Sequence, residues 1–212
     1  GALGRVKRMD DDGSDGRKAI HSGRAIRELF IGGSEMSLMM HTPQGLIDLE
    51  APAHTWGAPN WGALAISLSR INRWNGNTSR PYSVAEHSIR VARILPAGLK
   101  LAGLIHDAAE AFVGDLPYPI RQAGGIGRFE HIEAKITLWL YEDLEIRQLI
   151  GHPEVNEADR IMAATEYRDL CKGDPEAIGM VAPLAGVIGE GYGPGADYAR
   201  PWLDELRRLT GQ

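Results

Sequence analysis

The sequence predicts an all-α domain, a helical bundle of six or seven helices with a short extended N-terminal segment. Two observations favour this fold class. Apolar residues recur at three- and four-residue steps along most of the chain, which is the helical period, and alternating strand-like runs are few. No internal repeat is visible. With 212 residues, the chain is long enough for one sizeable core, so we expect a single domain over residues 36–212.

Composition and charge narrow the class of protein. Hydrophobic residues make up 43% and charged residues 24% of the chain, which is typical of a soluble globular protein. The net charge of −5 argues against a nucleic acid polymer as partner, but a metal ion or local arginines could still bind a small anion. The single cysteine, Cys171, excludes an intrachain disulfide and a cysteine-based zinc cluster, as expected of a cytoplasmic protein. No apolar run is long enough for a membrane span, and no signal-peptide pattern is present.

The first 35 residues are charged, rich in glycine and poor in apolar side chains, and we expect a disordered tail. Two short apolar runs then flank a Thr-Pro-Gln-Gly turn between Met39 and Leu49, which predicts a small hairpin or an extended flap. Residues 51–59 contain two prolines and are expected to form a loop.

A helix is predicted from Trp61 to about Arg73, with Asn60 as its cap. The turn-rich loop that follows carries Arg73 and Trp74. An arginine can bind phosphate bidentately, and a tryptophan can stack on a base or sugar. An equally good interpretation makes Trp74 a core residue at the helix end.

Ser83 and Glu86 form a capping-box pattern that opens a helix from Val84 to about Leu95. His87 lies in its first turn. Taken alone, a histidine at such a position is more often structural than a ligand.

The stretch Leu101–Pro117 concentrates four ionisable residues in an otherwise apolar helix pattern: His106, Asp107, Glu110 and Asp115. His106 and Glu110 are four residues apart and are expected on one side of the helix, one turn from each other. Charges in a buried helix are costly unless they are compensated, and a divalent cation suits imidazole and carboxylate together. Asp115 follows in a break between Gly114 and Pro117, where an aspartate often only stabilises a turn.

Further helices are predicted over residues 128–144, from Glu157 to about Cys171, and over residues 198–209. Asn156 is the expected cap of the second, which would place Asp159 in its first turn, where an acidic side chain complements the helix dipole. Residues 173–195 are predicted to be an irregular connection.

His87, His106, Asp107 and Asp159 together supply two imidazoles and two carboxylates from three predicted helices. They are four plausible ligands for one divalent cation, with room for water and substrate. Each residue has a structural explanation of its own, and the joint occurrence favours a metal site.

This pattern resembles that of the HD-domain metal-dependent phosphohydrolases, which carry a histidine, then a His-Asp pair, then an aspartate. The likeness is greatest to the 5'-deoxynucleotidases of bacteria and phages and to their relatives that hydrolyse deoxynucleoside triphosphates. It rests on four stretches: Ile71–Trp74, Tyr82–Ser88, Leu104–Pro117 and Ala158–Leu170.

The resemblance implies that His87, His106, Asp107 and Asp159 hold one divalent metal ion, which could be Mn, Co, Zn, Ni or Fe. It also implies roles for further residues, and one departure from the family pattern stands beside them. Glu110 would act on or organise the attacking water, and Asp115 would be a second acid–base or water-orienting group. Arg73 would contact the phosphate, Arg121 would lie near it, and Trp74 would pack on the deoxyribose. Asn156 stands where relatives frequently have a lysine.

The resemblance therefore predicts a small nucleotide as substrate and assembly into homo-oligomers. The lack of a long apolar run predicts no membrane partner. Three alternatives to a 5'-deoxynucleotidase remain at this point. The chain could be a deoxynucleoside triphosphate triphosphohydrolase, a phosphohydrolase of cyclic dinucleotides or signalling nucleotides, or a non-catalytic nucleotide-binding protein.

Overall fold

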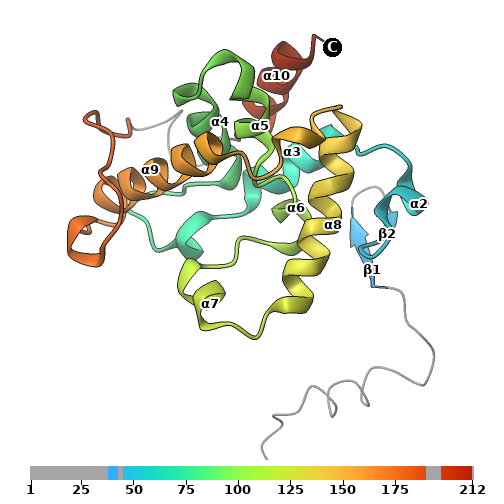
Figure 1. Cartoon of the computed structure of the whole chain (residues 1–212), viewed down its shortest axis with the longest axis horizontal. Coiled ribbons are helices and arrows are strands. Elements are labelled where there is room, and N and C mark those ends of the chain that lie inside the picture. The colour runs from blue at the N-terminus through green and yellow to red at the C-terminus, as the bar shows by residue number, and fades with distance from the viewer. Residues whose placement is uncertain (1–37, 43–44, 190–196, 212) are drawn as a thin grey trace, which may run out of the picture. The chain divides into compact units, whose positions relative to one another are not determined.

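A computed structural model of the chain describes residues 38–42, 45–189 and 197–211, all within the unit Ser37–Gln212. The described part is mostly helical with one small two-stranded sheet, in agreement with the predicted fold class (Figure 1). The disordered tail predicted for residues 1–35, and residues 190–196 of the predicted irregular connection, lie outside the described residues. No helix in the described ranges combines the length and the apolar character that a bilayer crossing requires.

The predicted hairpin is confirmed in the described strands. Strands β1 (Met39–Thr42) and β2 (Gly45–Asp48) pair antiparallel, with Met40 opposite Ile47. The Ile47 side chain is fully buried in the main core, so the hairpin is attached to the helical body by apolar packing.

The loop predicted over residues 51–59 is in part wrong, because Pro52–Trp56 form a short helix, α2. Pro52 occupies the first helical position, where its fixed φ suits the helix and its missing N–H removes no intrahelical bond. At the other end, Trp56 packs edge-on against Phe112 and Trp139, with ring centroids about 6 Å apart. Tertiary packing of this aromatic cluster stabilises a helix that is too short to be recognised from its period.

Helix α3 (Trp61–Arg70) begins as predicted, since the Asn60 side chain accepts a hydrogen bond from the backbone N–H of Ala63 at 2.9 Å. It ends earlier than predicted, because Ile71 is extended and its carbonyl accepts from the N–H of Val84. The chain then makes a 3-10 turn over Arg73–Gly76.

Helix α4 (Val84–Ile94) is capped by the Ser83 hydroxyl, which accepts from the N–H of Glu86 at 3.2 Å. The second half of the predicted capping box is wrong. The buried Glu86 carboxylate accepts hydrogen bonds from Arg80 and Arg90 instead of from the backbone of Ser83. Two guanidinium groups provide a stronger set of charge-assisted bonds than one amide.

The single central helix predicted within Leu101–Pro117 is wrong in its continuity. A 3-10 turn (Ala97–Leu99) leads into α5 (Lys100–Ile105), and α6 (Glu110–Val113) follows after a turn over residues 106–109. Around this turn the backbone bonds span three residues instead of four, for example from Glu110 N–H to Asp107 O at 3.0 Å. The tighter winding changes the direction of each side chain relative to an α-helix.

The C-terminal half contains α7 (Tyr118–Ala123), α8 (Gly127–Asp143), α9 (Pro153–Asp169) and α10 (Ala199–Thr210), with 3-10 turns at Arg147–Leu149 and Glu176–Ile178. Helix α7 was not predicted. Helix α9 begins earlier than predicted, with Pro153 in its first turn and His152, not Asn156, as the cap. Asp159 therefore lies in the second turn, where the helix dipole alone is a weaker explanation for an acidic residue.

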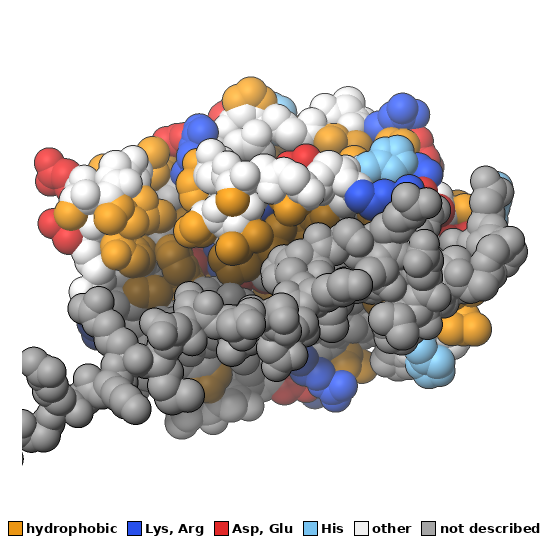
Figure 2. Space-filling model, turned by 90° about the horizontal axis from the view of Figure 1, so that it is seen from below, with side chains coloured by type: hydrophobic (Ala, Val, Ile, Leu, Met, Phe, Trp, Pro, Cys, Tyr) orange, Lys and Arg blue, Asp and Glu red, His pale blue; other side chains and the backbone are white. Residues whose placement is uncertain are grey.

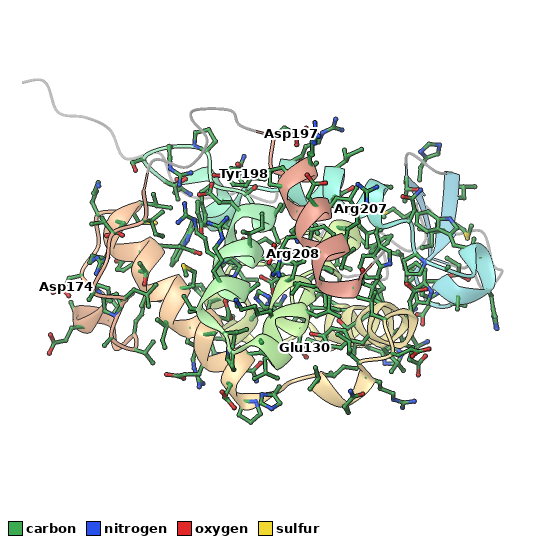
Figure 3. All side chains as sticks on the ribbon, turned by 90° about the horizontal axis from the view of Figure 1, so that it is seen from above. Glu130, Asp174, Asp197, Tyr198, Arg207 and Arg208 are labelled. Atoms are coloured by element: carbon green, nitrogen blue, oxygen red, sulfur yellow. The ribbon has the colours of Figure 1, made fainter. Side chains whose placement is uncertain are left out.

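Helix α4 is at the centre of the bundle and packs against α3, α5, α9 and α10 (Figure 1). Figure 3 shows α10 in front of these helices, with Tyr198 at its start and Arg207 and Arg208 in its last turns. On its inner side, the fully buried Trp202 stacks on Trp61. The arrangement brings α4, the turn after α5 and α9 together around one part of the core.

Candidate metal centre

The four residues predicted as metal ligands meet at one place. His87 comes from α4, His106 and Asp107 from the turn between α5 and α6, and Asp159 from α9. Each contributes one ligand atom, and these atoms lie within 4.8 Å of one another. The structure therefore contains a group that could hold a metal ion, built from the residues that the sequence predicted.

The spacing of the ligand atoms fits a single ion. His87 Nε2 lies 3.1 Å from Asp159 Oδ1 and 3.3 Å from His106 Nε2, and His106 Nε2 lies 3.2 Å from Asp107 Oδ2. Atoms bound at about 2.1 Å to one ion in tetrahedral or octahedral geometry lie roughly 3.0–3.4 Å apart. Two further pairs are wider, at 3.5 Å from His87 Nε2 to Asp107 Oδ2 and 3.7 Å from His106 Nε2 to Asp159 Oδ1. The donor types, two imidazoles and two carboxylates, suit a divalent cation.

Both imidazoles are oriented by a hydrogen bond at Nδ1. His106 Nδ1 lies 2.8 Å from the carbonyl oxygen of Gly103, and His87 Nδ1 lies 2.5 Å from Glu166 Oε1. Because a carbonyl and a carboxylate accept hydrogen bonds, each Nδ1 carries a proton, and each Nε2 points toward the other ligand atoms. This ring orientation is the one a metal ligand bound through Nε2 needs.

Glu166 was missed by the sequence analysis, although it is fully buried and contacts a predicted ligand. One signal could have found it, since Glu166 follows Asp159 by two helical turns and so projects from the same face of α9. Burial raises the pKa of Glu166, but the positive charges of Arg73 and His87 outweigh it and bring the pKa to about 2. Glu166 is therefore ionised at neutral pH.

The ligand atoms form an electron-rich cluster, and their pKa values reflect this. Burial lowers the pKa of His106, yet Asp107 and Asp159 outweigh it and raise this pKa well above its usual value. Burial also opposes ionisation of Asp159, but hydrogen bonds with His106 and His87 hold its pKa well below the usual range. The cluster thus attracts a cation, either a proton or a metal ion.

Glu110 and Asp115, the predicted acid–base residues, are both in the electrostatic field of the cluster. Burial, with the negative charges of Asp107 and Asp115, raises the pKa of Glu110 well above its usual value. Burial also raises the pKa of Asp115, against the positive charge of Arg73. Among the described residues, the buried Glu110 Oε2 has no hydrogen-bond partner. A carboxyl group with these properties is suited to proton transfer.

Arg73 lies beside the predicted ligands. Its Nη1 donates to Asp107 Oδ2 at 3.2 Å and its Nε to Glu166 Oε2 at 3.1 Å. The side chain is mostly buried, so this guanidinium would meet an anion with little competition from water. This position beside the candidate metal ligands is compatible with the predicted contact of Arg73 with a phosphate.

Trp74 is neither a free stacking surface nor a simple core residue. Its indole Nε1 donates to Glu166 Oε2 at 3.0 Å, and its ring stacks on Tyr167 with centroids 5.6 Å apart. Trp74 and Asn75 both have positive φ values, 57° and 49°. Two consecutive non-glycine residues in this region are strained, and such strain is frequent where a site requires a particular backbone.

Arg121 is not in contact with the four ligands. Its guanidinium donates to both carboxylate oxygens of Glu133, at 2.8 and 2.7 Å, and lies over the Phe129 ring. It lies close enough to Glu110 and Asp107 for their charges to raise its pKa, after the larger effect of Glu133. Binding of phosphate by Arg121 stays a prediction. Asn156, the residue that departs from the family pattern, donates to the Gly151 carbonyl oxygen at 3.3 Å.

The chain is similar to two curated proteins whose names assign no activity. It is 36% identical over 107 residues to the uncharacterized protein YfdR of Escherichia coli, a match that covers 50% of this chain and 58% of YfdR. It is 28% identical over 153 residues to an uncharacterized protein of Rhodobacter capsulatus, and this match covers 66% of this chain and 71% of that protein. No family model matches the chain.

Proposed function

We propose that the protein is a metal-dependent phosphohydrolase of the HD-domain type that cleaves phosphate from (deoxy)nucleotides, with 5'-deoxynucleotidase activity as its principal reaction. One observation carries the proposal. Two imidazole and two carboxylate ligand atoms lie within 4.8 Å of one another, next to the buried Glu110 carboxyl group and the buried Arg73 guanidinium. This combination provides a cation site, an acid–base group and an anion-binding group together.

His87, His106, Asp107 and Asp159 would hold the ion. A divalent cation bound there would act as a Lewis acid on the phosphate and lower the pKa of water. Arg73 would offset negative charge on the phosphoryl oxygens, because its Nη1 already lies against the ligand Asp107. Hydrolysis forms a bond from a water oxygen to phosphorus and breaks the bond from phosphorus to the 5' oxygen of the nucleoside.

Glu110 and Asp115 would manage the protons of this reaction. One carboxyl group takes a proton from the attacking water, and the departing 5' oxygen gains one. A raised pKa, as burial and neighbouring charges produce at both residues, helps a carboxyl group to give up as well as to take a proton. Oε2 of Glu110 is buried without a hydrogen-bond partner among the described residues, which costs folding free energy. A catalytic role explains why such a group is kept, whereas a non-catalytic nucleotide-binding protein would not need it.

A monophosphate suits the site better than a triphosphate. The guanidinium of Arg73 is paired with Asp107 and Glu166, and that of Arg121 with Glu133. Asn156 adds no charge where relatives frequently have lysine. A triphosphate carries more negative charge than a monophosphate and needs more cationic groups. Triphosphohydrolase activity is therefore the second outcome to test.

The proposal extends to a small nucleotide as substrate, not a nucleic acid polymer or a membrane. The net charge of −5 supports this. On the face in Figure 2, the described residues present mainly apolar and uncharged side chains, with charged side chains toward the edges. The proposed homo-oligomer would cover apolar side chains that are exposed in the single chain, such as Tyr118, Ile120 and Val187. A lone cysteine fits the proposed cytoplasmic location.

The substrate class is tested by phosphate release from a panel of deoxy- and ribonucleoside mono- and triphosphates. The protein would be stripped of metal, and manganese, cobalt or zinc then added back. Release of inorganic phosphate from deoxynucleoside monophosphates, lost in Asp107→Ala and kept in the exposed control Asp204→Asn, supports the proposal. Release of tripolyphosphate would reassign the protein to the triphosphohydrolases, and no turnover by the metal-loaded protein would refute it.

A further inference from the structure

Glu166 contacts three side chains with different expected roles. Its Oε1 lies against His87 Nδ1 at 2.5 Å, and its Oε2 accepts from Arg73 Nε at 3.1 Å and from Trp74 Nε1 at 3.0 Å. The carboxylate is fully buried. One buried group thus connects a candidate metal ligand with the two residues expected to meet the substrate.

The contact is part of a larger docking of one loop onto one helix. Arg73 and Trp74 are consecutive in the 3-10 turn, and Glu166 and Tyr167 are consecutive on α9. Trp74 stacks on Tyr167 in addition to its bond to Glu166. Further along the loop, the N–H of Ser79 donates to the carbonyl of Leu170 at 2.8 Å. The loop therefore runs alongside the C-terminal end of α9.

The backbone of this loop requires such support. Trp74 and Asn75 both have positive φ values, a conformation that persists only where surrounding contacts over-determine it. The indole nitrogen and ring face of Trp74 are both engaged from α9. Loss of the Glu166 carboxylate would leave the Trp74 side chain with the ring stack alone.

From these contacts we infer that Glu166 is a positioning residue that couples the metal centre to the substrate-binding loop. It selects the His87 tautomer whose Nε2 can bind a cation, and it holds Arg73 and Trp74 in place. The part that concerns the substrate rests on the proposed function. The part that concerns the histidine and the loop does not, because it applies to the metal-free protein.

Replacement of the carboxylate by an amide tests both functions of this group. In Glu166→Gln the side chain keeps its size but presents one acceptor and one N–H donor. An amide N–H that faces His87 Nδ1 would favour the tautomer protonated at Nε2, which cannot bind a cation. The amide oxygen could then serve Arg73 or Trp74 with half of the original acceptor capacity. Glu157→Gln is the matched control, since Glu157 lies on the same helix, is half-buried and pairs with Arg160.

The experiment is ¹⁵N-detected NMR of the histidine rings and tryptophan indoles in metal-stripped protein, together with Mn²⁺ affinity. In the wild type and in Glu157→Gln we expect His87 protonated at Nδ1 and a hydrogen-bonded Trp74 indole N–H. In Glu166→Gln we expect the Nε2–H tautomer, a shifted indole resonance and Mn²⁺ affinity lower by about 10- to 100-fold. Trp74→Phe identifies the indole resonance and should leave the His87 tautomer unchanged.

The inference is overturned if Glu166→Gln keeps the wild-type tautomer, indole resonance and Mn²⁺ affinity. It is also overturned if Nδ1 of His87 in the wild-type protein carries no proton, a result that does not depend on whether the variant folds. None of these readouts requires turnover. A protein that passes them but hydrolyses no nucleotide would refute the proposed function and leave the role of Glu166 intact.

Discussion

The Nε2 atoms of His87 and His106 lie 3.3 Å apart, although the Nδ1 atom of each ring is already engaged elsewhere. The Nε2 atoms of the two rings therefore face each other, with Asp159 Oδ1 and Asp107 Oδ2 beside them. Such a group of acceptors is stable only with a proton or a metal ion between its members.

The first concerns thermal stability. Addition of Mn²⁺ or Zn²⁺ at about 100 times its dissociation constant to metal-stripped protein should stabilise the fold by roughly 3 kcal/mol. For a chain of this size that is a rise in melting temperature of roughly 5–10 °C. Scanning calorimetry measures it, with Asp159→Asn as the variant that should lose the rise and Asp204→Asn as the one that should keep it. An equal rise in both variants would place the ion elsewhere.

The second concerns the pH dependence of metal binding. The pKa of His106 is raised well above its usual value by Asp107 and Asp159 in spite of burial. In the metal-free protein, the protonated ring stabilises the fold below the unfolded pKa near 6.5, and this stabilisation is lost as pH rises through the higher folded pKa. A metal ion must displace that proton, so affinity should rise with pH by roughly tenfold per unit below the folded pKa. Titration calorimetry in buffers of different ionisation enthalpy counts the released protons, and an affinity independent of pH would contradict the prediction.

The third concerns acid stability. The pKa of Glu166 is about 2 because Arg73 and His87 outweigh the effect of burial. A lowered carboxyl pKa stabilises the fold above the unfolded pKa, near 4.5, and that contribution is lost as pH falls toward 2. The shift corresponds to about 3 kcal/mol. Urea unfolding of metal-free protein should thus show a steeper loss of stability between pH 4.5 and pH 2 in the wild type and Glu157→Gln than in Glu166→Gln. Parallel curves for all three would show that Glu166 is not the group concerned.

The fourth concerns the support behind Trp74. A Cβ atom added at Gly173 would lie 2.1 Å from the Tyr167 ring, on which Trp74 stacks. Gly173→Ala should therefore displace Tyr167 and Trp74, with a cost of about 1–3 kcal/mol in stability and a rise in KM for a deoxynucleoside monophosphate. Metal affinity should be unchanged, because no candidate ligand moves. Gly98→Ala is the control, since nothing lies within 4 Å of its added Cβ. Unaltered KM and stability in Gly173→Ala would show that Trp74 is not positioned through Tyr167.

The sequence predicted the larger helices because each carries a helical period, and two of them also carry a recognisable cap. Asn60 and Ser83 begin α3 and α4 as expected. The errors fall where tertiary contacts overrule local signals. The central stretch reads as one helix, yet the chain winds more tightly between His106 and Glu110, and no residue pattern marks that change.

The candidate site shows the same contrast between residues that the sequence pattern identifies and residues that only tertiary contacts reveal. The four ligand candidates were identified because their residue types and order form a recognisable pattern, and the structure brings them together. Glu166 was missed because an acidic residue inside a helix is ordinary in sequence and becomes informative only when buried beside Arg73 and His87. Likewise, the bond that pairs Arg121 with Glu133 joins α7, which was not predicted, to α8.

The most direct test of the central claim is a titration of metal-stripped protein with Mn²⁺ in which bound ion and phosphate release from a deoxynucleoside monophosphate are measured on the same samples. The account predicts that activity rises in proportion to bound ion, saturates at one ion per chain, and is absent from Asp159→Asn at every concentration. Activity without bound ion, or full activity in Asp159→Asn, would contradict it.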